Sequence, residues 1–328
     1  MTAAPSDREL VVTRLINAPR ALVFRAFTDP AQVVHWWGPF GFRNTSHEMR
    51  VQPGGVWRLT MHGPDGTDHP NESRYTAVVE GERLAFRHGT GAEDGPWFDT
   101  TITFTDEGGQ TRVTLRQVYA TAAEATVAKT FALEGGNQTL TRLEGYLAVS
   151  RALASPAVLE GVEPGTDDVD FLLTRTLQAP RDLVYRVMTE PLHLAKWFGP
   201  AGMELRVVSA DVRPGGTLRY AMKAGPHEMF GRFVYRELRP SDRMVNVVSF
   251  TDPEGTPVRH PMSATWPLEV LGLTSLTERA GQTVMYGRSI PIHATAEDRA
   301  TFRAGHAGMV QGWKGTWDQL ETYLSTLR

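Results

Sequence analysis

Residues 18–39 read APRALVFRAFTDPAQVVHWWGP and residues 179–200 read APRDLVYRVMTEPLHLAKWFGP, so one stretch of the chain returns 161 positions later. Eleven of the 22 aligned positions are identical. The same offset places Pro53-Gly54-Gly55 on Pro214-Gly215-Gly216 without a gap. Solenoid repeats have periods of only ~20–50 residues, so this longer period indicates a duplicated domain.

Composition agrees with two domains and excludes several classes of protein. A chain of 328 residues is about two domains of ~150 residues each. The absence of cysteine excludes disulfides, thiolate zinc sites and cysteine nucleophiles. The net charge is −3 and neither half is basic, which argues against nucleic-acid binding. Without a signal core or an apolar run of ~18 residues, we expect no membrane contact and a cytoplasmic location.

The repeat sets the expected boundaries. Copy one is predicted over residues 8–150, a linker over 151–168, and copy two over 169–328. The linker contains Pro, Gly and acidic residues, which predicts an ordered or semi-ordered spacer. Its Ala and Leu content also allows an extension of the preceding helix.

Each copy is predicted to contain a strand, two short helices, a run of strands and a long closing helix. Alternating apolar residues and turn signals predict strands in copy one at 9–16, 56–62, 73–79, 84–88, 97–105 and 112–119. In copy two they predict strands at 217–223, 231–238 and 244–250, a hairpin around 278–282 and a C-terminal helix that is longer at its start than that of copy one. The closing helix of copy one, 121–149, is expected to be interrupted or restarted near Gly135-Gly136. The Gly-Gly turns should each contain a residue with positive φ.

Four short sequence motifs that occur in both copies indicate a family resemblance. The opening (A)PR.LV(F/Y), the helix end W(W/F)GP, the turn PGG and the terminal L(E)..YL follow one another in both copies. The chain resembles the START-like (SRPBCC, helix-grip) superfamily, in the group named after the C-terminal domain of the heat-shock-protein ATPase activator. The resemblance implies an α+β fold of two tandem helix-grip domains. In each domain, a curved antiparallel sheet would wrap around a long C-terminal helix with a cavity between them.

Residues that face this cavity are the candidate ligand-binding residues. Strand alternation is the guide to the inward positions, where a mostly apolar lining with a few polar groups would suit a small hydrophobic molecule. The alternative is that these side chains only fill a core. The tryptophan pairs have two readings as well, as an aromatic gate or, more often, as anchors for the short helices. The candidates are Trp36, Trp57, Phe98, Gln117, Trp197, Tyr220, Ser289, Trp313 and Trp317.

Copy two is the favoured binder. Its last helix carries Gly312-Trp313-Lys314-Gly315-Thr316-Trp317, where copy one is aligned with Gly136-Asn137-Gln138-Thr139-Leu140-Thr141. The tryptophans would add aromatic wall to copy two. In the competing interpretation they fill its cavity, and copy one, with Asn137 and Gln117, is the open and more polar site.

Catalytic and metal-binding signals are weak. No histidine belongs to an H-x-x-x-H or H-E-x-x-H arrangement, so we expect no metal site, and no cofactor motif is present. His88 at a strand end and His227 in a loop could act as acid or base at a cavity mouth, but are more simply interpreted as solvated. A serine nucleophile has no supporting motif.

Three functions remain open. The first is a protein that binds a small hydrophobic molecule, in stress or resistance. The second is a didomain cyclase/aromatase-like enzyme acting on a polyketide-like substrate. The third is a co-chaperone of a heat-shock ATPase. It ranks last because the resemblance covers only the C-terminal domain of that activator.

Overall fold

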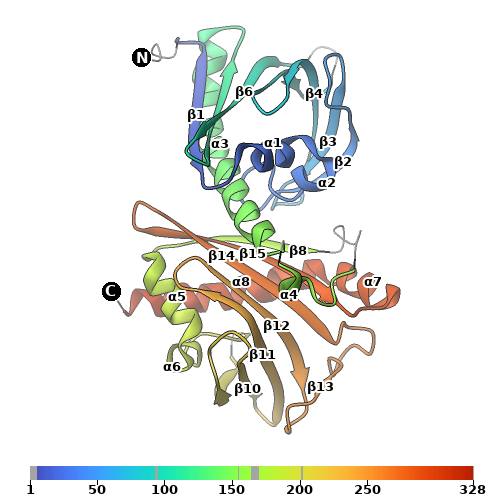
Figure 1. The fold of residues 1–328 in the computed structure, drawn as a ribbon, viewed down its shortest axis with the longest axis vertical. Helices are drawn as coiled ribbons and strands as arrows, with labels where there is room; N and C mark the ends of the chain where they lie inside the picture. The colour runs from blue at the N-terminus through green and yellow to red at the C-terminus, as the bar shows by residue number, and fades with distance from the viewer. Residues whose placement is uncertain (1–5, 93–94, 154, 164–169, 201, 328) are drawn as a thin grey trace. The chain divides into compact units, whose positions relative to one another are not determined.

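The computed structural model describes residues 6–92, 95–153, 155–163, 170–200 and 202–327. It divides into two compact units, Met1–Leu147 and Ala148–Arg328, here called unit 1 and unit 2. Both units are α+β, with an antiparallel sheet and a long C-terminal helix (Figure 1). This is the predicted fold class.

In the described residues of unit 1, seven antiparallel strands form one sheet in the order β1-β7-β6-β5-β4-β3-β2. The strands are β1 (Glu9–Ile16), β2 (Arg43–Met49), β3 (Val56–His62), β4 (Asp68–Val79), β5 (Arg83–Gly89), β6 (Trp97–Glu107) and β7 (Gln110–Val118). The helices are α1 (Arg20–Thr28), α2 (Pro30–Val33) and α3 (Ala122–Ala152), which continues past the end of unit 1.

Unit 2 repeats this topology, with its sheet in the order β8-β15-β14-β12-β11-β10-β9 and β13 paired with β12. The strands are β8 (Phe171–Leu177), β9 (Glu204–Ala210), β10 (Thr217–Ala224), β11 (His227–Arg239), β12 (Arg243–Thr251), β13 (Pro257–Val258), β14 (Glu269–Arg279) and β15 (Gln282–Ile292). The helices are α4 (Pro156–Leu159), α5 (Arg181–Thr189), α6 (Pro191–Leu194), α7 (Ala296–Ala304) and α8 (His306–Ser325). In Figure 1, α8 lies across one face of this sheet.

The repeated tryptophan anchors the short helices in each unit. Trp36 Nε1 donates to the Ala26 carbonyl at 3.1 Å, and Trp197 Nε1 donates to the Val187 carbonyl at 3.1 Å. Both rings are buried, and Trp36 has no exposed surface. A buried aromatic ring with a satisfied N–H combines a large apolar area with a fixed orientation. The anchoring interpretation of these two tryptophans is therefore confirmed.

The Gly-Gly turns contain the expected positive φ, at +80° for Gly54 and +81° for Gly215. The second glycine of each pair is needed for a different reason. A Cβ atom on Gly55 would lie 2.0 Å from the Arg50 carbonyl oxygen, and one on Gly216 would lie 2.1 Å from that of Asp211. One glycine thus supplies a backbone conformation and the other a close backbone approach.

The interruption predicted in the closing helix of copy one is wrong. Helix α3 runs unbroken through Gly135-Gly136, although each glycine costs ~1 kcal/mol in a helix. Gly136 lies against β1, where a Cβ atom would be 3.0 Å from a methyl of Val12. Tertiary packing therefore outweighs helix propensity at this point. In unit 2 the predicted C-terminal helix is α8, and a separate helix, α7, precedes it and ends at Gly305.

The strand predictions missed β2, β9 and β13. β2 and β9 are the edge strands of their sheets, and their half-exposed residues include no fully buried side chain. Their positions alternate only between exposed and half-exposed, so the contrast between apolar and polar residues on which the prediction depended is weak. β4 and β11 also begin earlier than expected, which places His227 in a strand rather than a loop.

The predicted linker is partly helical. α3 extends through Ala152, as its composition allowed, and α4 follows. Residues 154 and 164–168 of the predicted linker lie outside the described residues. The domain boundaries stay a prediction.

Candidate functional site: a cavity in unit 2

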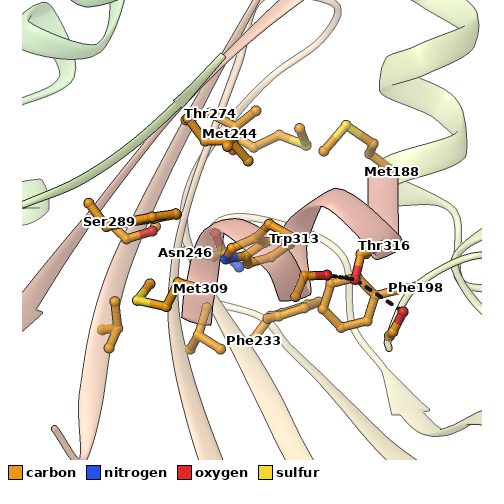
Figure 2. A pocket seen from close by; sticks show the side chains of 18 of the residues that line it. Met188, Phe198, Phe233, Met244, Asn246, Thr274, Ser289, Met309, Trp313 and Thr316 are labelled. Atoms are coloured by element: carbon orange, nitrogen blue, oxygen red, sulfur yellow. Dashed lines mark hydrogen bonds between the residues drawn. The ribbon is translucent and has the colours of Figure 1, made fainter. Parts of the chain in front are cut away.

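A cavity of about 370 Å³ lies between the sheet of unit 2 and helix α8 (Figure 2). Its volume is within the ~300–1,000 Å³ typical of small-molecule sites. The wall is predominantly aromatic and aliphatic. Its larger apolar side chains are Phe171, Leu173, Met188, Leu194, Trp197, Phe198, Tyr220, Met222, Phe233, Tyr235, Met244, Val248, Phe250, Trp266, Val270, Leu273, Phe302, Met309, Trp313 and Trp317.

Four small residues on the hairpin β14–β15 form part of the sheet side of the wall. Gly272 pairs with Ser289, and Thr274 pairs with Gly287. Residues two apart on a strand point to the same face, and all four line the cavity. They form a patch two strands wide that carries almost no side-chain volume. We call this patch the small-residue floor.

The corresponding hairpin of unit 1 carries larger side chains. Its turn pair, Glu107 with Gln110, corresponds to Arg279 with Gln282 in unit 2, so equivalent positions are 172 apart. The floor residues Gly272, Thr274, Gly287 and Ser289 thus correspond to Thr100, Ile102, Leu115 and Gln117. Thr100, Ile102 and Leu115 are buried. The duplicated face is therefore filled in unit 1 and hollow in unit 2.

Gly287 is not required by the backbone. Its φ is not positive, and an added Cβ atom would meet only the Leu173 carbonyl oxygen, at 3.8 Å. A glycine inside a strand costs roughly 0.5–1 kcal/mol relative to alanine, and it often marks a place that a ligand approaches. Gly287 therefore contributes open space to the cavity.

The helix side of the wall is a stack of indole rings. The rings of Trp313 and Trp317 are 4.9 Å apart at an interplanar angle of 17°, and those of Trp317 and Trp197 are 5.9 Å apart at 27°. Phe198 lies beside Trp197 in an edge arrangement at 5.7 Å. Such a stack presents a broad apolar surface with little rotamer entropy to lose.

The structure corrects the alignment of the two closing helices. Arg142 donates to the Gly38 carbonyl in unit 1, and Gln319 donates to the Gly199 carbonyl in unit 2. Equivalent helix positions are therefore 177 apart, which is one more than the pairing of Gly136 with Gly312 assumed. The same offset aligns the terminal motif of copy one, residues 143–147, with residues 320–324 in the sequence. Trp313 thus corresponds to Gly136 and Trp317 to Leu140. Both tryptophans are additions of unit 2.

No charged side chain of the described residues points into the cavity, because Arg288 lies between Gly287 and Ser289 on β15 and its side chain therefore points to the opposite face of the sheet. Arg288 donates from Nε to Asp170, and both side chains are buried. Burial raises the pKa of Tyr220 and of Tyr235 well above the usual range of tyrosine, so both are neutral at physiological pH. The polar side chains Asn246, Thr274 and Ser289 complete the wall, and Figure 2 shows them with Trp313 and Thr316 of α8.

The candidates of copy two come together in this cavity. Trp197, Tyr220, Ser289, Trp313 and Trp317 all line it. Those of copy one lie elsewhere, in unit 1. Trp36 and Trp57 are core residues. That any of these residues binds a ligand stays a prediction.

Phe98 and Gln117 belong to a small aromatic cluster of unit 1. The rings of Phe98 and Tyr119 stack at 4.9 Å, and the Tyr119 hydroxyl donates to Gln117 Oε1 at 3.2 Å. His88 lies beside Phe98 at 5.2 Å and forms a 2.8 Å hydrogen bond through Nδ1 with the buried Ser73 hydroxyl. Burial lowers the pKa of His88 to about 4. His88 is thus a half-buried, hydrogen-bonded residue of β5 rather than a solvated residue of a loop.

Sequence reasoning missed several wall residues. Asn246 was not singled out. Strand pairing shows that it replaces a phenylalanine, because Asn246 is opposite Tyr235 in unit 2 and Phe86 is opposite Tyr75 in unit 1. Trp266 lies between β12 and β14, in the segment 252–268. The corresponding segment of unit 1, between β5 and β6, is the shorter 90–96. The sequence signal for the small-residue floor is a glycine inside each strand of the last hairpin, Gly272 and Gly287.

The described residues were also compared with the requirements of a metal site and of a membrane-spanning helix. No cluster of three or more histidine and carboxylate side chains suited to a metal ion occurs among them. Over the same ranges, no helix is both long and apolar enough to span a bilayer.

Comparisons with known proteins divide into partial and whole-chain matches. Protein Ms6760 from Mycobacterium smegmatis is 28% identical, with 42% of this chain and 89% of that chain covered and a TM-score of 0.39. Protein NE0264 from Nitrosomonas europaea is 23% identical, with 45% and 99% covered and a TM-score of 0.42. The di-domain ARO/CYC BexL from the BE-7585A biosynthetic pathway is 15% identical, with 97% and 98% covered and a TM-score of 0.37.

No curated protein matches the chain. A family match, however, covers most of it and occurs twice, in the order in which the sequence repeat places the two copies. Residues 17–148 and residues 178–325 match the family described as Activator of Hsp90 ATPase homolog 1-like protein, and the chain therefore belongs to this family as a tandem pair.

Proposed function

We propose that the chain binds a small, largely hydrophobic molecule in the cavity of unit 2. The observation that carries the proposal is the small-residue floor, where Gly287 leaves space that no backbone requirement explains. The opposite wall of stacked tryptophans supplies contact area, and few polar groups are present to orient a ligand. This combination is typical of small-molecule sites.

A cyclase/aromatase-like enzyme is the second candidate, and the composition of the wall favours it less. General acid–base catalysis needs a group whose pKa lies near the working pH. In the described part of the wall, the titratable side chains are Tyr220, Tyr235 and Arg288. The tyrosines have raised pKa values and Arg288 is paired with Asp170, so the wall offers no evident base.

Filling the floor tests the proposal. Gly287→Leu introduces the residue that unit 1 carries at the equivalent position, Leu115. We expect it to abolish saturable binding of the neutral fluorescent probe N-phenyl-1-naphthylamine while the melting temperature stays the same or rises. The stability expectation follows because a strand glycine is removed and empty volume is filled.

Gly308→Leu is the matched control, since Gly308 lies on α8 with open space around it and outside the cavity wall. It should bind the probe as the wild type does. Equal binding by both variants would reject the cavity as the site. Native mass spectrometry of protein from its own host would then look for a retained molecule, whose mass would also test the sequence-based expectations of a stress or resistance role.

A further inference from the structure

The cavity wall has two chemically different sides. The helix side presents the flat stack of Trp313 and Trp317, and the sheet side presents Asn246 and Ser289. In the paired strands, Asn246 is opposite Gly272 and Gly272 is opposite Ser289. The two polar side chains therefore flank one glycine in a single row across three strands, roughly 10 Å apart at their backbones.

Gly272 makes room for the amide of Asn246. A Cβ atom at position 272 would lie 3.2 Å from Asn246 Oδ1, tighter than an ordinary carbon–oxygen contact. The side chain of Asn246 forms no hydrogen bond within the described residues, and it is half-buried at the cavity wall. Its carbonyl and NH₂ groups therefore remain for water or for a ligand.

Charge is unfavourable in the same space. Arg288, the charged residue of the described wall, points to the opposite face of the sheet and is paired there with the buried carboxylate of Asp170. An ionised ligand would lose its hydration without gaining an uncompensated counter-ion in the described part of the wall. An uncharged ligand loses much less on entry.

Resting on the proposed function, we infer that the ligand is an uncharged, flat aromatic molecule with a polar edge. The aromatic face packs on Trp313, and the polar edge lies over Gly272 with hydrogen bonds to Asn246 and Ser289. In this arrangement Asn246 is the residue that determines specificity. A site built around a polar side chain disfavours an analogue that leaves this group unpaired.

Three probes with the same ring system test separately the aromatic face, the polar edge and the absence of charge. Fluorene has the ring system alone, 9-fluorenone adds a hydrogen-bond acceptor, and 9-fluorenone-2-carboxylate adds a negative charge. Their affinities for the full chain are measured by calorimetric titration. We expect fluorenone to bind roughly three- to tenfold more tightly than fluorene, which is the worth of one neutral hydrogen bond, and the carboxylate to bind more weakly than either.

Asn246→Leu replaces the amide by an apolar side chain of similar size and should bring the ratio of fluorenone to fluorene affinity to about one. Asn71→Leu, the same replacement at a half-exposed position of β4 outside the cavity wall, is the control and should keep the wild-type ratio. A wild-type ratio near one, a ratio unchanged by Asn246→Leu, or tightest binding of the carboxylate would each overturn the inference.

Failure of the proposed function gives a different result. None of the three probes would then bind saturably, or Gly287→Leu would leave their binding unchanged. Equal binding of fluorene and fluorenone that Gly287→Leu abolishes would keep the cavity as the site and reject only the role of Asn246.

Discussion

At the scale of single residues, equivalent positions of the two copies have taken on different chemistry. His88 in β5 is enclosed by the rings of Phe86 and Phe98 and by the Ser73 hydroxyl. The equivalent residue of unit 2, by the pairing of β11 with β12, is Val248, which lines the cavity. One position is thus a half-buried polar contact in unit 1 and an apolar wall in unit 2.

His88 gives unit 1 a defined pH dependence. Its pKa is about 4 in the folded protein against an ordinary value of 6.5, so the unfolded chain binds a proton that the folded state does not. The free energy of unfolding should therefore fall as the pH drops from about 6.5 towards 4. In His88→Gln this part of the slope should be absent, as measured by urea unfolding across this range. The same replacement at the exposed His47 is the control, and identical slopes for His88→Gln and the wild type would contradict the prediction.

At the scale of elements, an arginine of the first strand is bound to the closing helix in both units. Arg14 of β1 donates to Glu144 at 3.1 Å and to Thr141 at 2.9 Å, and Arg175 of β8 donates to Glu321 at 2.6 Å. These ion pairs differ in burial. The side chains of Arg14 and Glu144 are 7% and 14% exposed, and those of Arg175 and Glu321 are 27% and 34% exposed.

The difference in burial predicts unequal costs. Glu144→Gln removes the carboxylate that accepts a hydrogen bond from a buried guanidinium and should lower the free energy of unfolding by about 1–3 kcal/mol. Glu321→Gln should cost less than about 1 kcal/mol, because its partner is more exposed and retains Asp318. Denaturant unfolding of the two variants measures the difference. A larger loss for Glu321→Gln would show that burial does not determine the strength of these pairs.

The elements that the sequence predicts well are those with a strong apolar period or a turn signal. The anchored short helices, the PGG turns and the two hairpins are confirmed because each depends on local residues. The edge strands β2 and β9 were missed because none of their residues is fully buried, which leaves only a weak contrast between apolar and polar positions. The break at Gly135-Gly136 was wrong because packing against Val12 requires a small residue within a continuous helix.

At the scale of the whole chain, the repeat predicts two similar units but not which one is hollow. The offset between equivalent residues grows from 161 at the first helix to 172 at the last hairpin and 177 at the closing helix. A constant offset therefore fails to align Leu115 with Gly287 or Leu140 with Trp317. Strand pairing was needed to compare the two walls residue by residue.

The unequal walls predict one ligand per chain rather than two. The small-residue floor of unit 2 corresponds to Thr100, Ile102, Leu115 and Gln117 in unit 1, and the side chains of the first three are buried in its core. Native mass spectrometry of the intact chain with saturating 9-fluorenone should show a single bound molecule. Gly287→Leu should show none, because the occupied volume is that of unit 2 alone. Two bound molecules in the wild type, with one left in Gly287→Leu, would mean that unit 1 binds the probe as well.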